Sequence, residues 1–106
     1  MTGMESLSYE FSGSRSVAPF APVIVGVVAS GNLEVLVEAV AADVCAVHVE
    51  TSARGFGAIW AAVLRDFQER HAFKGLSVSI NDMGATPAVV SLRLDQAVAG
   101  LKGVAP

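Results

Sequence analysis

Residues 23–38 read Val-Ile-Val-Gly-Val-Val-Ala-Ser-Gly-Asn-Leu-Glu-Val-Leu-Val-Glu, two apolar runs rich in β-branched residues around a short polar segment. Two such runs joined by Ser-Gly-Asn are typical of a β-hairpin. Gly31 and Asn32 tolerate the positive φ that a tight turn demands. We therefore expect Ser30 at the tip of a hairpin loop, with its hydroxyl facing water. Taken alone, that placement is more typical of an ordinary turn residue than of a functional serine.

Further strand patterns surround the hairpin. Apolar and polar residues alternate over residues 7–11, 33–38, 44–50 and 76–81, as they do in half-buried strands. Residues 23–28 are apolar on both faces, which favours an inner strand of the sheet.

Two later segments repeat their apolar residues at helical spacing. The first segment is 56–71, with Gln68 among its outer polar residues, and Gly75 is expected to stop it. Its apolar positions are Phe56, Ile59, Trp60, Val63, Leu64 and Phe67. Thr86-Pro87 is typical of an N-cap and first helical position, so 88–101 is predicted to be the second helix, with a strand over 89–94 as the main alternative.

The predicted order is four strands, a helix, a strand and a helix. This order predicts a two-layer α+β fold, a mostly antiparallel sheet of about five strands with two helices on one face. The 106 residues form one domain, residues 1–106, and residues 1–4 and 102–106 are expected to be frayed.

The composition is unusually apolar. Apolar residues make up 53% of the chain and charged residues only 16%, against about 25% charged in an ordinary domain. Either a partner covers part of the surface, or small apolar residues reflect a GC-rich genome. The net charge of -3 and the absence of a Lys/Arg cluster in the sequence argue against nucleic acid as a partner.

Targeting signals are not evident in the sequence. The longest apolar run, residues 17–29, holds two prolines and is shorter than the ~20 residues that a membrane span needs. Residues 1–13 carry two glutamates and no basic region, unlike a signal peptide. We expect no membrane association and a cytoplasmic location. A single cysteine, Cys45, excludes an internal disulfide and is expected to be a small core residue.

The residues for independent catalysis are sparse. A serine hydrolase needs a histidine base and an orienting carboxylate, and neither His48 nor His71 has a recognised spacing to Ser30. Both histidines are expected to be solvated surface residues, and Trp60 is expected to belong to the core. Two histidines with scattered carboxylates do not indicate a metal site.

The segment Asn81-Asp82-Met83-Gly84-Ala85-Thr86-Pro87 combines a carboxylate, a glycine and a helix start. In one interpretation it is a strand-to-helix connection, in which Gly84 makes the turn, Thr86 caps the helix and Asp82 steadies the loop. In the other, this loop lies beside Ser30 and helps to form a docking surface.

Two motifs together resemble a known family. Residues 30–36, Ser-Gly-Asn-Leu-Glu-Val-Leu, and residues 81–96, Asn-Asp-Met-Gly-Ala-Thr-Pro-Ala-Val-Val-Ser-Leu-Arg-Leu-Asp-Gln, resemble the acyl carrier protein (delta subunit) of bacterial malonate decarboxylase. That family has a Ser-Gly-Asp turn leading into Leu-Glu-Val-Leu, and later Asp-x-Gly-Ala-Thr-Pro leading into Val-Val-x-Leu-Arg-Leu-Glu-Gln. The carrier subunit of citrate lyase is similar in layout. The resemblance covers about residues 23–98.

The resemblance implies that Ser30 carries a covalent arm, 2'-(5''-phosphoribosyl)-3'-dephospho-CoA, joined by a phosphodiester and ending in a thiol. Gly31 and Asn32 would complete the attachment turn, and Asp82, Gly84 and Glu34 would serve docking or support. The implied partners are a prosthetic-group transferase (the holo-carrier synthase), an acyl-transferase subunit that exchanges acetyl for malonyl, and decarboxylase subunits. The carrier itself would be non-catalytic.

Three positions depart from the family pattern. Asn32 stands where Asp is usual, Ala29 where Gly is common, and Asp95 where Glu is usual. Asn keeps the turn geometry but removes one charge, which bears on recognition by the modifying enzyme. The alternatives to a carrier are a small α+β regulatory or interaction domain that binds a ligand or subunit non-covalently, and a free-standing hydrolase that uses Ser30.

Overall fold

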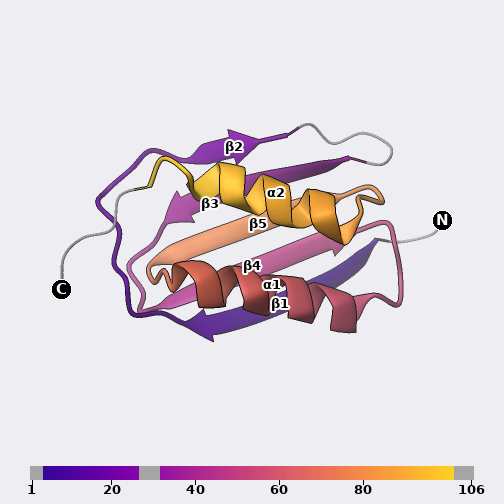
Figure 1. The fold of residues 1–106 in the computed structure, drawn as a ribbon, viewed down its shortest axis with the longest axis horizontal. Helices are drawn as coiled ribbons and strands as arrows, with labels where there is room; N and C mark the ends of the chain where they lie inside the picture. Colours follow the sequence, from indigo (N-terminus) through magenta and orange to yellow (C-terminus); the bar gives the residue numbers. More distant parts are fainter. Residues whose placement is uncertain (1–3, 27–31, 102–106) are drawn as a thin grey trace.

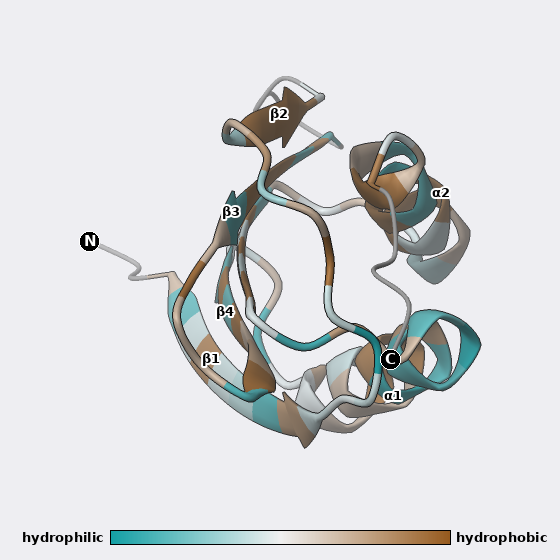
Figure 2. Cartoon of the chain, turned by 90° about the vertical axis from the view of Figure 1, so that its left-hand side faces the viewer, coloured by the Kyte–Doolittle hydropathy of each residue, from teal (hydrophilic) through white to brown (hydrophobic). Residues whose placement is uncertain are grey.

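The computed structural model describes residues 4–26 and 32–101, which form a five-stranded sheet and two helices (Figure 1). The elements are β1 (Glu5–Ser12), β2 (Val23–Val25), β3 (Leu33–Ala39), β4 (Val44–Thr51), α1 (Gly57–His71), β5 (Leu76–Asp82) and α2 (Pro87–Val98). The strand order is β1-β4-β5-β3-β2, and neighbouring strands are antiparallel except for β4 and β5. Both helices cover the same face of the sheet (Figure 2). The predicted two-layer α+β fold is confirmed.

The core lies between the sheet and the two helices. Every second residue of β3, β4 and β5 points toward the helices and is buried, as the alternating sequence patterns predict. The buried apolar side chains of the strands are Leu33, Val35, Val37, Cys45, Val47, Val49, Leu76, Val78 and Ile80. Those of the helices are Trp60, Leu64, Phe67, Val90, Leu94, Ala97 and Val98. Burial raises the pKa of the Cys45 thiol to about 11, as expected for a core cysteine.

The prediction that residues 23–28 form an inner strand is wrong. β2 is the edge strand, and it pairs only with β3 among the strands described. Val23 and Val25 are half-buried on the helix side, whereas Ile24 points away from the helices and is 64% exposed. In β2, the apolar run therefore consists of two valines that face the helices and one exposed isoleucine. It does not reflect burial on both faces of the strand.

The end of α1 also differs from the prediction. The helix ends at His71, and Ala72 takes the left-handed conformation with φ of 55°. Gly75 has φ of 74°, but it lies at the turn into β5, where its N–H donates to the Val44 carbonyl. Gln68 was expected on the outer face of the helix, but its side chain is buried. The buried amide nitrogen is satisfied, because it donates hydrogen bonds to the Ser12 and Phe73 carbonyls.

The start of α2 is as predicted. Thr86 is the N-cap, its hydroxyl oxygen accepts a hydrogen bond from the Val89 N–H at 3.3 Å, and Pro87 follows at the first helical position. The competing strand over 89–94 is thereby excluded.

A cluster of charged side chains joins the two helices. Asp95 of α2 accepts hydrogen bonds from Arg70 at 2.7 Å and from His71 at 3.0 Å, and Arg70 also contacts Asp66. Burial alone would raise the pKa of Asp95. Hydrogen bonds from His71 and Arg70, together with their charges, outweigh that effect and hold the pKa of Asp95 below its ordinary value.

We expect Asp95→Ala to lower the free energy of unfolding at pH 7 by less than about 1 kcal/mol, because the Asp95 and Arg70 side chains are more than one-third exposed to screening water. A pKa lowered by folding stabilises the protein above the unfolded value of about 4 and loses that effect as the pH falls through the folded value. Urea unfolding from pH 7 to pH 2 should show the two proteins converging in acid. Glu69→Ala, which removes an exposed carboxylate of α1 next to Arg70, is the control and should not show this convergence.

Candidate functional site

The candidate site lies at the end of the domain where β2 leads into β3 (Figure 1). The predicted attachment residues Ser30 and Gly31 lie outside the described residues. Val25 pairs with Val35 in antiparallel register, which confirms that β2 and β3 are hairpin partners. Gly26 has φ of 90°, and a Cβ atom there would collide with the Leu33 carbonyl oxygen, so only glycine fits at the base of this connection.

Asn32 is exposed, and its backbone fastens the start of β3 to the turn that follows β5. The Asn32 carbonyl accepts a hydrogen bond from the Met83 N–H at 2.9 Å, and Leu33 pairs with Asp82. The two motifs that the sequence separates by about fifty residues are therefore neighbours. Gly84, with φ of 97°, makes the turn and is exposed.

Asp82 is buried, with 2% of its surface exposed, and its carboxylate holds the turn together. One carboxylate oxygen accepts from the Thr51 hydroxyl at 2.7 Å, and the other accepts from the Ala85 N–H at 2.8 Å. The Asp82 carbonyl also accepts from the Ser52 N–H. Both carboxylate oxygens thus serve the connection between β4, β5 and α2, and the group is not available to a docking partner.

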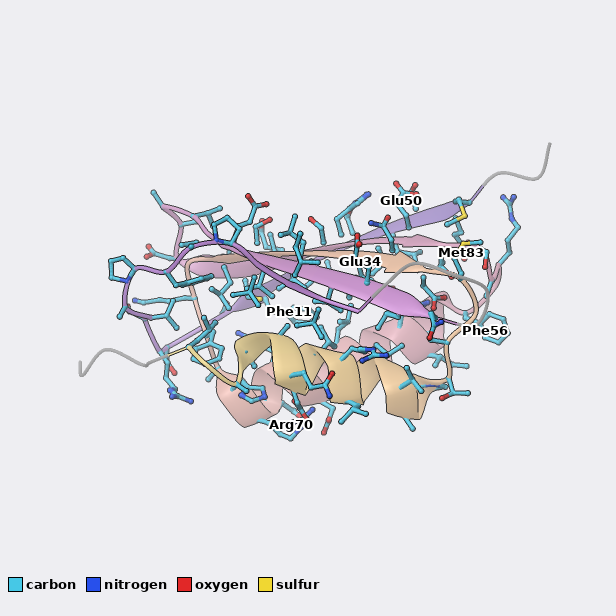
Figure 3. All side chains as sticks on the ribbon, turned by 90° about the horizontal axis from the view of Figure 1, so that it is seen from above. Phe11, Glu34, Glu50, Phe56, Arg70 and Met83 are labelled. Atoms are coloured by element: carbon cyan, nitrogen blue, oxygen red, sulfur yellow. The ribbon has the colours of Figure 1, made fainter. Side chains whose placement is uncertain are left out.

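Glu34 lies on the opposite face of the sheet, away from the helices (Figure 3). Its carboxylate accepts a long hydrogen bond, 3.4 Å, from the Asn81 amide. The structure therefore does not bring Glu34 and Asp82 together. Glu34 belongs instead to an open, acidic sheet face. The glutamates on this face are Glu10, Glu34, Glu38 and Glu50. Within the strand bounds given above, no residue is Lys or Arg.

Between the starts of the two helices lies a hollow of about 200 Å³, which we call the apolar hollow. From α1 and its N-cap, it is lined by Phe56, Ile59, Trp60 and Val63. From the other side, it is lined by the turn at Asp82, Gly84 and Ala85 and by Pro87 and Val90 of α2. Phe56 and Ile59 were predicted as part of a buried stripe, but they are 46% and 45% exposed at this hollow.

Neither histidine is placed to assist a serine in this end of the domain. The His71 ring stacks on Phe73, lies tilted against Phe67 and contacts the Asp95 carboxylate. His48 lies on the open sheet face, where its ring nitrogens contact the Ser8 hydroxyl at 3.0 Å and the Glu50 carboxylate at 2.9 Å.

The Ser8–His48–Glu50 row has the residue types of a hydrolase triad but not its surroundings. Its three residues lie on the paired strands β1 and β4, and their contacts are exposed on the open sheet face. A hydrolase triad works beside oxyanion donors in a site that excludes water. Across residues 4–26 and 32–101, no three His, Cys, Asp or Glu side chains are grouped to hold a metal ion. Neither helix among these residues is long and apolar enough to cross a membrane.

Comparison with known proteins assigns the chain to a family. The family model described as the malonate decarboxylase delta subunit matches residues 21–101. The chain belongs to the malonate decarboxylase delta subunit family. The malonate decarboxylase acyl carrier protein of Burkholderia cepacia is 69% identical over 98 residues, which cover 92% of this chain and 91% of the relative. That of Acinetobacter calcoaceticus is 55% identical and covers 94% of this chain and 99% of the relative.

A solved structure supports the same assignment. A chain in the crystal structure of a Pseudomonas malonate decarboxylase hetero-tetramer in complex with malonate matches this delta-subunit fold with a TM-score of 0.80. The two chains are 36% identical, and the match covers 91% of this chain and 97% of the other.

Sequence reasoning missed three residues of this delta-subunit site. Thr51 continues the inward face formed by Cys45, Val47 and Val49. A polar side chain at such a buried position needs a hydrogen-bond partner, so the sequence pattern could have identified Thr51. Phe56 and Ile59 gave no such signal, because an apolar spacing does not reveal whether a neighbouring element covers the stripe.

Proposed function

We propose that this protein is the acyl carrier subunit of a malonate decarboxylase complex. In this role, it carries acetyl and malonyl groups as thioesters on a 2'-(5''-phosphoribosyl)-3'-dephospho-CoA arm attached to Ser30. The observation that carries the proposal is the family match over residues 21–101, which includes the whole connection from β2 to β3. Ser30 lies in this connection, and its Ser-Gly-Asn sequence resembles the Ser-Gly-Asp turn of the family, which supports Ser30 as the attachment residue.

The surroundings of the connection suit an attachment point. β2 and β3 form a paired base, and the Asn32–Met83 hydrogen bond ties that base to the turn after β5. Two peptide units separate Ser30 from Asn32, so their Cα atoms can be no more than about 8 Å apart. An exposed Asn32 and the apolar hollow nearby leave room for a large group and offer it a surface.

In such a complex, the carrier subunit needs no catalytic residues of its own. The arm supplies the thiol that holds the acyl group, and bond making and breaking belong to the acyl-transferase and decarboxylase subunits. A carrier needs a rigid platform and a tether, because tethering raises the effective concentration of the acyl group at each site it visits. The buried Asp82 and Thr51 pair stiffens this platform instead of serving as an acid or base.

The open sheet face supports a second part of the proposal, the docking of partner subunits. Its glutamates carry negative charge with no Lys or Arg in the strands that form it. Such a field attracts a basic partner surface and speeds encounter. We assign this face to the cytoplasmic partners that the family implies: the acyl-transferase subunit, the decarboxylase subunits and the holo-carrier synthase.

The decisive experiment is the intact mass of the protein purified from its native host with its complex active. We expect a mass above that of the polypeptide by one nucleotide-containing group, and fragmentation should locate the phosphodiester on Ser30. A polypeptide mass alone would overturn the carrier assignment, and a reversible ligand without added mass would favour a regulatory domain. The group on another residue, such as the exposed Ser52 of a neighbouring loop, would overturn the assignment of Ser30.

A further inference from the structure

The function proposed so far does not say which chemical group occupies the apolar hollow between the helix starts. Large apolar side chains at its rim, Phe56 and Ile59, are almost half exposed, which costs free energy in water. Trp60 and Val90 close its inner side and are buried. Figure 3 places Phe56 and Met83 at the same end of the molecule. The hollow thus adjoins the turn that is fastened to Asn32.

The size and chemistry of the hollow restrict its occupant. Its volume of about 200 Å³ is below the ~300 Å³ at which pockets for drug-sized ligands begin, so it admits a small group. Asp82 is the charged side chain in its lining, and both carboxylate oxygens already accept hydrogen bonds from Thr51 and Ala85. No cationic side chain lines the hollow among the residues described. A buried carboxylate would therefore find no partner there.

The start of α1 lies at the rim, where Phe56 and Ile59 line the hollow. Phe56, the N-cap, has no side-chain acceptor, and the first turn of α1 contains no acidic residue. The first N–H groups of a helix lack partners within the helix and attract carbonyl or anionic oxygen. A small apolar group attached through a carbonyl would match this combination of apolar walls and N–H donors.

We propose that the apolar hollow binds the acetyl-thioester end of the chain's own covalent arm and leaves the malonyl form in solvent. This inference rests on the proposed function. The reason for the selectivity is charge. The methyl of an acetyl group gains from contact with Phe56, Ile59 and Trp60, whereas the malonyl carboxylate would lose its hydration without a compensating cation. The hollow therefore shields the resting acetyl form and presents the malonyl form to the next enzyme.

The position of the hollow favours the arm over a side chain of a partner subunit. The turn that lines it is bonded to Asn32, two residues along the chain from the proposed attachment point, so the hollow lies within reach of an arm attached there. The acidic face proposed for docking lies on the side of the sheet away from the helices (Figure 3). A partner subunit bound to that face would therefore not cover the hollow, which lies between the helices.

The test uses the full chain carrying its arm, after intact mass has shown that the arm is present. The arm thiol is loaded with a 13C-labelled acetyl group, and its transfer to excess free cysteamine is compared with that from acetyl-CoA. If the acetyl end occupies the hollow nine-tenths of the time, transfer slows about tenfold. Ile59→Asp should restore the rate of acetyl-CoA, because it places a charge at the rim.

Ile59→Asp is suited to this test because acidic residues in the first turn of a helix favour folding. Leu92→Asp, at a residue of α2 that is 55% exposed and outside the hollow, is the matched control and should keep the slow transfer. Phe56→Ser provides a second rim variant. In the unmutated protein, NMR should show contacts from the labelled methyl to the Trp60 indole, and the Trp60 N–H signal should move on acetyl loading but not on malonyl loading.

These outcomes separate this inference from the proposed function. Absence of the arm in the mass spectrum would end both. An arm on Ser30 with acetyl transfer as fast as from acetyl-CoA, and with an unchanged Trp60 signal, would overturn the hollow as an acetyl site and leave the carrier function standing. A Trp60 signal that moves only when partner subunits are added would show that a partner occupies the hollow, and this too would overturn the inference.

Discussion

Ser30→Ala is expected to abolish malonate decarboxylation by the reconstituted complex, with a loss of at least about a hundredfold because the tether is removed along with the hydroxyl that anchors it. Alanine has no oxygen that could form the phosphodiester. Neither Asp82 nor His48 is placed to replace the arm, since the buried Asp82 is engaged with Thr51 and Ala85 and His48 lies on the open sheet face. Malonate-dependent CO2 release, measured alongside the intact mass, checks this prediction.

The control for Ser30→Ala is Ser52→Ala. Ser52 is also an exposed serine, in the loop after β4, and the contact described for it is a backbone N–H to the Asp82 carbonyl that the substitution leaves in place. This variant should keep both the added mass and the activity. The complex should also assemble with Ser30→Ala, as gel filtration would show. Activity retained by Ser30→Ala in an assembled complex would contradict a covalent carrier role.

Periodicity was a reliable guide where one face of an element is buried. The alternation in β3, β4 and β5 identified which residues face the helices, and Thr86-Pro87 located the start of α2. These patterns are local, because each depends on neighbours one to four residues away. The helical spacing of α1 was likewise found, and its buried members Trp60, Leu64 and Phe67 are core residues.

The errors share a physical cause, which is that local patterns do not say which element is the neighbour. The apolar run 23–28 gave no indication that β2 would be an edge strand with Ile24 exposed. The prediction put Gln68 on the outer face because the helical pattern does not reveal its hydrogen-bond acceptors. These acceptors, the Ser12 and Phe73 carbonyls, lie outside the helix. The parallel pairing of β4 with β5 likewise depends on the course of the whole chain.

For the candidate site, family resemblance and local pattern contributed different parts. The family resemblance pointed to Ser30, and one interpretation of residues 81–87 put their loop beside it. The Asn32–Met83 hydrogen bond that joins the two motifs follows only from the pairing of β5 with β3, which local patterns do not predict. The hollow at Phe56 and Ile59 is a product of where two helices begin relative to each other, which no local pattern contains.

Asp82→Ala is expected to lower the free energy of unfolding by about 3 kcal/mol, because the Thr51 hydroxyl and the Ala85 N–H would both lose their acceptor in a buried place. A negative charge near the start of α2 would also be lost, and this charge stabilises the partial positive charge of the helix N-terminus. Urea unfolding checks the prediction. Asp43→Ala, at an exposed loop carboxylate, is the control and should change stability by less than about 0.5 kcal/mol.

The partner substitution shows whether the loss belongs to this contact. Thr51→Val keeps the shape of the side chain and removes the hydroxyl, so the combination of Asp82→Ala with Thr51→Val should destabilise less than the sum of the two single variants. Strict additivity would mean that the 2.7 Å contact contributes nothing to stability. Asp82→Asn should fall between the unmutated protein and Asp82→Ala, because one acceptor oxygen remains. Hydrogen exchange at Met83 should quicken in the same order, since this N–H joins the turn to the Asn32 carbonyl at the base of the proposed attachment loop.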